Sequence, residues 1–85
     1  MQVELKLLGN PVGYKEVEME KVPQPGREIS LHAFQREPIR FYVMEVTYGN
    51  RPMVLLKINE GGVSRQEVFE RCSFYSTIPV AKSLT

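Results

Sequence analysis

The stretch from Ile39 to Ile58 constrains the fold of this chain more than any other part of its sequence. Two runs rich in β-branched and aromatic residues meet there at Gly49-Asn50. A two-residue loop with glycine first is typical of a type II′ hairpin turn. Counted outward from that turn, the expected cross-strand pairs are Val46–Met53, Glu45–Val54, Met44–Leu55, Val43–Leu56, Tyr42–Lys57 and Phe41–Ile58.

The predicted hairpin is apolar on both faces. One face, with Phe41, Val43 and Leu56, suits the interior of a small β-domain. An antiparallel strand that faces water on one side normally alternates apolar with polar residues, so the second face also needs a cover. Two candidates stay open, the chain's own helix and another polypeptide, which includes a second copy. The second face carries Tyr42, Met44, Val46, Tyr48, Met53 and Leu55.

Three further segments alternate with the period of 2 that is typical of strands. They cover residues 3–8, 14–22 and 28–34, and Gly, Pro and Asn residues separate them. The second segment places Glu16, Glu18 and Glu20 on one face, because successive side chains of a strand point to opposite sides. We interpret this acidic row as a solubilising face or an edge that repels strand addition, with an interaction patch as the alternative.

A short helix is expected near residues 65–75, after Gly61-Gly62. Ser64 at the N-cap and Glu67 three positions later form the pattern of a capping box. At helical spacing Val68, Cys72 and Tyr75 share one face, and Phe69 lies beside them. A last extended segment is expected at 78–80.

Length and composition limit the fold to one small β-rich domain over residues 1–85. Hydrophobic residues make up 42% and charged residues 25%, which are values of a folded domain. We predict a mainly β fold, a small antiparallel SH3-like or OB-like barrel of about five strands with one short helix. An α+β two-layer sheet is the alternative.

The middle of the chain has a pattern of three stretches: Val22-Pro23-x-x-Gly26-x-x-Ile29-x-Leu31, Phe41-x-Val43-x-x-Val46-x-Tyr48 and Val54-Leu55-Leu56-Lys57-Ile58. This pattern resembles a group of short β-barrel proteins, mostly uncharacterised, of phages, prophages and bacteria. The resemblance covers residues 22–58 and implies a phage-linked accessory protein, with no activity and no site residue attached.

Few residues in this sequence could carry catalysis or hold a metal. His32 and Cys72 are the single histidine and the single cysteine, and they lie forty residues apart without a CxxC or HxxxH spacing. A transition-metal site needs three or four converging ligands, and a cysteine nucleophile needs a base beside it. We therefore expect no enzymatic activity, no metal and no cofactor. His32 is expected on the surface and Cys72 in the core.

The residues give no sign of secretion or membrane insertion. The N-terminus lacks a cationic start followed by an apolar run, and no apolar stretch approaches the roughly 20 residues that span a bilayer. A lone cysteine suits a reducing compartment. We expect a cytoplasmic protein without membrane contact, and composition does not separate that setting from a virion component.

Two functional hypotheses follow. The first is a non-enzymatic protein-binding module, with a host or virion protein or a second copy as its partner, since Tyr, Met and Arg are enriched in interface cores. The alternative is a single-stranded nucleic-acid-binding barrel that uses Tyr42, Tyr48, Arg40, Arg51 and Lys57. The net charge of +1 gives that alternative little support. The residues predicted to bind the partner are Tyr42, Met44, Tyr48, Arg51, Met53 and Lys57.

Overall fold

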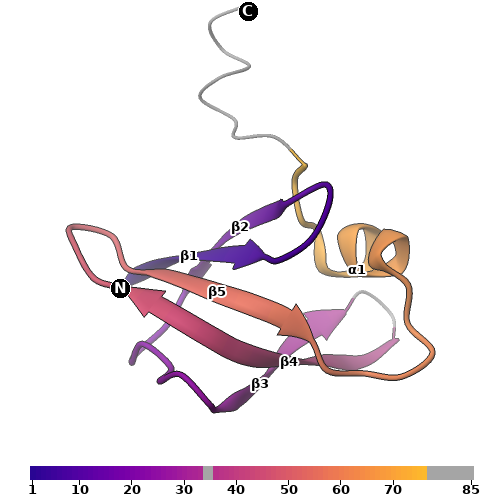
Figure 1. Ribbon diagram of the computed structural model, residues 1–85, viewed down its shortest axis with the longest axis horizontal. Coiled ribbons are helices and arrows are strands. Elements are labelled where there is room, and N and C mark those ends of the chain that lie inside the picture. Colours follow the sequence, from indigo (N-terminus) through magenta and orange to yellow (C-terminus); the bar gives the residue numbers. More distant parts are fainter. Residues whose placement is uncertain (34–35, 77–85) are drawn as a thin grey trace, which may run out of the picture.

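A computed structural model describes residues 1–33 and 36–76 of the chain. It contains five strands and one helix in the order in which the sequence analysis expects them (Figure 1). The expected extended segment at 78–80 lies outside the described residues. The elements are β1 (Gln2–Leu7), β2 (Gly13–Glu18), β3 (Glu28–Ala33), β4 (Arg36–Thr47), β5 (Met53–Ile58) and α1 (Arg65–Cys72).

The five strands form one sheet in the order β2-β1-β5-β4-β3, which is curled into a half-barrel. The β1–β2, β3–β4 and β4–β5 pairs are antiparallel, and β1 runs parallel to β5. The predicted mainly β, barrel-like fold with one short helix is thus confirmed. The parallel β1–β5 pair makes the sheet mixed rather than wholly antiparallel.

A β-bulge at Met44 divides the β4–β5 ladder into two registers. Val43 pairs with Leu56 as expected, but Glu45 rather than Met44 pairs with Leu55. One extra residue on the bulged strand breaks the alternation of faces there. Val46, predicted on the outer face, is therefore turned toward the core and packs against it.

The tight two-residue turn at Gly49-Asn50 does not form. The last pair of the ladder is Thr47–Met53, so residues 48–52 make a five-residue connection. Pro52 has no N–H to donate to β4, and its carbonyl instead accepts a hydrogen bond from the Glu4 N–H of β1 at 2.9 Å. The bulge and this proline together move the end of the ladder away from the glycine.

The N-terminal strands follow the predicted alternation. Val3, Leu5 and Leu7 of β1 are fully buried, while the residues between them are half-buried. β2 ends at Glu18, so Glu20 lies beyond the strand and the predicted three-residue acidic row is reduced to two carboxylates on β2.

The helix begins as predicted and ends earlier. The Ser64 hydroxyl accepts a hydrogen bond from the Glu67 N–H at 3.1 Å. Ser73 follows the helix with φ 60°, a left-handed conformation that stops further helical turns. As a result Phe74 is buried in the core, whereas Tyr75, predicted on the buried face, is 53% exposed and forms a β-bridge with Tyr14.

The helix packs on the concave side of the sheet, where it closes the core. Val68 and Cys72 of α1 are buried, and Phe74 packs against Phe41 of β4 with 6.1 Å between ring centroids. The Arg65 guanidinium donates to the carbonyls of Leu8 and Pro11 and so ties α1 to the β1–β2 turn.

Because of this packing, the helix does not cover the second face of the hairpin. Figure 1 shows α1 and the β4–β5 connection at opposite ends of the long axis of the molecule. Of the two candidate covers for the second face, the chain's own helix is therefore ruled out. This face of the hairpin is part of the protein surface. The buried core consists of Val3, Leu5, Leu7, Leu31, Ala33, Ile39, Phe41, Val43, Val54, Leu56, Val68, Cys72 and Phe74.

Candidate functional site

The face of the sheet that points away from the core and α1 is called the outer face here. It carries Tyr42, Met44, Met53 and Lys57 of the predicted interaction residues, while Tyr48 and Arg51 lie in the β4–β5 connection. Along the middle of this face, two apolar side chains of β5 lie beside two of β4. This outer stripe consists of Met53, Leu55, Tyr42 and Met44. Met44 lies in it because Val43 and Val46 both face the core, so that the two residues between them face outward.

Exposure is concentrated in the β4 half of the stripe. Tyr42 is 40% and Met44 is 42% exposed, and Tyr48, just beyond the end of β4, is 64% exposed. Six large apolar side chains are exposed among the described residues, and these three lie within seven positions of one another. Tyr42 and Met44 thus lie exposed on β4, and Tyr48 follows beyond the end of this strand.

The β5 half of the stripe is partly covered by charged neighbours. Met53 pairs with Glu4 and Leu55 pairs with Lys6 across the parallel β1–β5 ladder, and all four residues are half-buried. Long charged side chains can lay their methylene groups along apolar surface while the charge stays in water. Strand β1 therefore supplies part of the cover that the second face of the hairpin needs.

The β2–β3 connection supplies further contacts beside Tyr42 and Tyr48. The Gln24 side-chain amide donates to the Tyr48 hydroxyl at 3.3 Å. Gly26 has φ +88°, a conformation that other residues rarely adopt, and its N–H donates to the Val43 carbonyl at 2.9 Å. The prolines and the glycine of this Pro-x-Pro-Gly segment predict a break between two strands. No periodic pattern in the sequence indicates that the segment runs beside β4.

The predicted cations have different environments. Arg51 forms an ion pair with Glu16 of β2, so its side chain points toward β2 and its charge is already neutralised. Lys57 is exposed, pairs with Tyr42 across the ladder, and has no ion pair among residues 1–33 and 36–76. Of the two predicted cationic contacts, Lys57 is the one that stands beside the outer stripe.

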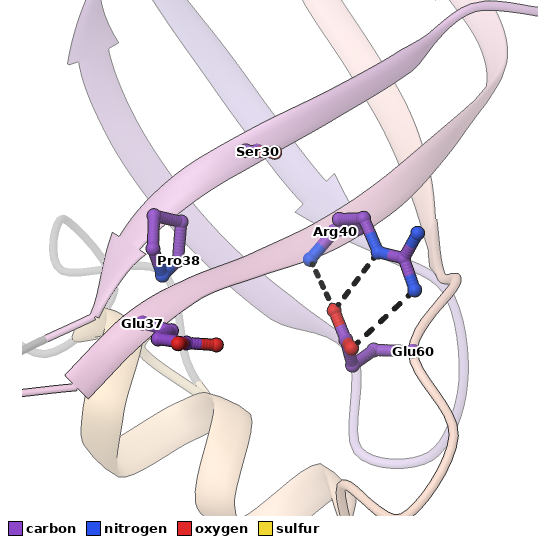
Figure 2. Close-up of a pocket in the computed structure, with 5 residues that line it drawn as sticks. All are labelled: Ser30, Glu37, Pro38, Arg40 and Glu60. Atoms are coloured by element: carbon purple, nitrogen blue, oxygen red, sulfur yellow. Dashed lines mark hydrogen bonds and ion pairs between the residues drawn. The ribbon is translucent and has the colours of Figure 1, made fainter.

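Arg40 and Glu60 form the densest polar contact on this side of the protein (Figure 2). One Glu60 oxygen accepts from the Arg40 Nε at 3.1 Å and from the Arg40 backbone N–H at 3.2 Å, and the other accepts from Nη2 at 3.5 Å. The hydrogen bonds from Arg40 hold the pKa of Glu60 below its ordinary value, and the same contact raises the pKa of Arg40.

The Arg40–Glu60 pair lines a shallow, open depression of about 570 Å³. Ser30, Glu37 and Pro38 complete its lining (Figure 2). The carboxylate of Glu60 already neutralises the one arginine of the lining, so the depression offers no free cation to an anionic ligand. We assign it a structural role, joining the β5–α1 connection to β4.

The residues considered for catalysis are kept apart by the sheet. His32 is exposed between the buried Leu31 and Ala33, whereas Cys72 is buried in the core. Burial raises the pKa of the Cys72 thiol, against the opposing effect of Lys15 and Arg71. Within the described part of the chain, no three His, Cys, Asp or Glu side chains are grouped so that they could hold a metal ion.

No protein-family model, curated protein or solved structure matches this chain. Among the residues that the structure describes, no helix is long and apolar enough to cross a membrane.

Proposed function

We propose that this protein is a non-enzymatic protein-binding module whose contact surface is the outer stripe together with Tyr48. One observation carries the proposal: Tyr42 and Met44 of β4, and Tyr48 just beyond its end, are exposed, while α1 packs against the opposite, core-facing side of the sheet. Large apolar side chains gathered on a surface commonly mark an interaction site.

Burial of these side chains against a protein partner is energetically favourable. Full burial of a side chain of this size contributes roughly 1.5–3 kcal/mol, and about half of that remains available for each of the three. Tyr and Met are enriched in the buried centres of interfaces, where Glu and Lys are depleted. The surface around the stripe is charged, which matches an apolar centre with a polar rim.

The nucleic-acid alternative finds less support. Arg40 is held by Glu60 and Arg51 by Glu16, which neutralises two of the three cations assigned to it. The outer face also carries two carboxylates, Glu4 paired with Met53 and Glu28 paired with Tyr42. Binding to a phosphate backbone scales with the number of phosphates that cations neutralise, and few cations are free here.

The nature of the partner follows from the resemblance rather than from the surface. The pattern over residues 22–58 implies a phage-linked accessory protein, so a host or virion protein is the expected target. A second copy of the chain is the other partner that the apolar stripe fits.

The test compares tyrosines that are matched in exposure but lie on different surfaces. The variant Tyr42→Thr/Tyr48→Thr removes both rings from the proposed contact surface, and Tyr75→Thr removes an exposed ring at the β2 edge. Threonine keeps the strand propensity, so both variants should retain the circular dichroism spectrum of the wild type.

Each immobilised protein is used for affinity capture with identification by mass spectrometry. We expect the wild type and Tyr75→Thr to retain the same protein and the double variant to lose it. Retention that is equal in all three contradicts the proposal. A steep fall of binding to a single-stranded oligonucleotide with salt, in the wild type alone, would favour the nucleic-acid alternative.

A further inference from the structure

The charges beside the outer stripe are distributed unequally between its two sides. On the β1–β5 side lie Lys6, which pairs with Leu55, and Lys57. On the β4–β3 side lie Glu45, which also pairs with Leu55, and Glu28, which pairs with Tyr42. Two successive rows across the sheet therefore read cation, apolar residue, carboxylate.

The charged residues nearby do not cancel this separation of cations and carboxylates. Arg40, next to Glu28, is neutralised by Glu60, and the hydrogen bond that Glu28 accepts at 2.9 Å comes from the uncharged side-chain amide of Asn59. Glu4 is the exception, a carboxylate on the β1 side one row further along. The net result is a positive and a negative margin about 10 Å apart, two strand spacings of about 4.8 Å.

The shape of the sheet limits how another molecule can meet this face. The sheet is curled around its core, so the outer face is convex. Two convex sheets touch along a stripe that follows the strands rather than across the whole width. The outer stripe of Tyr42, Met44, Met53 and Leu55 has this orientation, because it runs between β4 and β5.

A two-fold axis parallel to the strands makes the face complementary to itself. Such an axis exchanges the two sides of the stripe, so the Lys6 and Lys57 margin of one copy meets the Glu28 and Glu45 margin of the other. An axis across the strands would instead bring lysines against lysines. Two-fold contacts are the commonest route to a homodimer because one self-complementary patch is sufficient.

The charged margins have to take part because the exposed apolar side chains alone are too small for a stable interface. The exposed parts of Tyr42, Met44 and Tyr48 offer on the order of 300 Å². A stable interface needs about 800 Å² from each partner. The remaining area has to come from the residues that flank the stripe, and their charges then decide which arrangement forms.

We propose that two copies of this chain associate through their outer faces, with the two-fold axis along the strands and with Lys6 and Lys57 of each copy facing Glu28 and Glu45 of the other. This inference depends on the proposed function, since it names the partner of the same surface.

A charge-exchange experiment tests this arrangement. One variant carries Lys6→Glu/Lys57→Glu and the other carries Glu28→Lys/Glu45→Lys. Sedimentation velocity is run at low salt on the wild type, on each variant, and on their equimolar mixture. Because Glu28 contacts Asn59, the single variant Glu45→Lys is run in parallel, and circular dichroism confirms that every variant is folded.

We expect a concentration-dependent dimer for the wild type and a dimerisation constant weakened by more than about tenfold for each variant, since like charges then meet at both margins. The mixture should regain the dimer, because opposite charges meet again at both margins. The single variant Glu45→Lys should also dimerise less than the wild type, and mixing it with Lys6→Glu/Lys57→Glu should restore part of the dimer.

Three outcomes would overturn the inference: a monomeric wild type at all concentrations, variants that dimerise as well as the wild type, or a mixture that stays monomeric while both components are folded. A monomeric wild type whose capture of another protein still depends on Tyr42 and Tyr48 removes the homodimer and leaves the proposed function standing. Capture that ignores both tyrosines removes the proposed function itself.

Discussion

Ser64 shows how a single side chain fixes where the helix begins. Its hydroxyl satisfies the Glu67 N–H, one of the donors that the first turn of a helix leaves without a partner. The other half of the predicted capping box is replaced, because the Glu67 carboxylate accepts from Arg71 one turn later at 3.3 Å. The cap on the Ser64 side is thus the stabilising part.

Ser64→Ala should lower the free energy of unfolding by about 1 kcal/mol, because the Glu67 N–H loses its acceptor. Urea denaturation followed by circular dichroism measures the change. Ser64→Thr keeps a hydroxyl at the same position and serves as the control. Equal stability of the alanine variant and the wild type would contradict the role of the cap.

Cys72 is a second case in which one environment decides the chemistry of a residue. Its side chain is 1% exposed and its thiol pKa is raised by burial. The predicted packing of this cysteine in the core is confirmed; its low reactivity stays a prediction.

Thiol labelling of the folded protein at pH 8 should be slow and should become fast in denaturant. Since the folded thiol keeps its proton to higher pH than an unfolded thiol of ordinary pKa 9.0, the free energy of unfolding should be unaffected below that pH and should fall above it. Cys72→Ser, which has no thiol to ionise, should lack this part of the alkaline loss. Rapid labelling under native conditions would show that the side chain is accessible.

At the scale of elements, the bulge in β4 decides which side chains reach the outer face. The ladder is regular from Phe41–Ile58 to Val43–Leu56 and again from Glu45–Leu55 to Thr47–Met53. Met44 is the one residue of this stretch that stands outside both registers. Without Met44, the side chains of β4 would alternate regularly between the core and the outer face.

Deletion of Met44 should therefore be tolerated, with the fold and a cooperative unfolding transition retained. Deletion of Leu55 is the matched control, since it places the inward-facing Val54 and Leu56 next to each other and forces one of them out of the core. Two-dimensional amide NMR spectra of the three proteins measure the outcome. Loss of the folded spectrum on deletion of Met44 would show that the bulge is required for folding.

At the scale of the whole molecule, the segment after α1 completes the core. Phe74 is 6% exposed and packs against Phe41 and Phe69, with 6.1 and 6.2 Å between ring centroids. Its neighbour Tyr75 is exposed and joins the edge of β2 through two backbone hydrogen bonds of 2.8 Å with Tyr14. Adjacent aromatic residues thus have opposite roles.

Phe74→Ala should cost about 3–5 kcal/mol, the usual loss for a buried phenylalanine. A domain of this size is stable by roughly 4–13 kcal/mol, so the variant should lose a large fraction of its stability. Tyr75→Ala should lower the free energy of unfolding by only about 1 kcal/mol, because about half of this side chain already faces water. Thermal unfolding of both variants compares the two; equal losses would contradict the assignment of Phe74 to the core.

Local patterns determined most of the elements of this protein. The alternation in β1, β3 and the start of β4, and the serine that caps α1, each depend on residues a few positions apart. Such patterns state which side chains share a face, and so Tyr42 and Met44 were correctly placed away from the core. The same patterns could not show how far the second face would be covered.

Only the tertiary structure decided the events that depend on partners distant in sequence. Three features depart from the local sequence pattern: the bulge at Met44, the end of α1 at Cys72 and the burial of Phe74. Each depends on contacts with residues of another element, namely β5 for the bulge and Phe41 of β4 and Phe69 of α1 for Phe74. The position of α1 against the concave face likewise follows from packing, because an apolar helix face fits either side of an apolar hairpin. That choice, which no local period encodes, left Tyr42, Met44 and Tyr48 exposed.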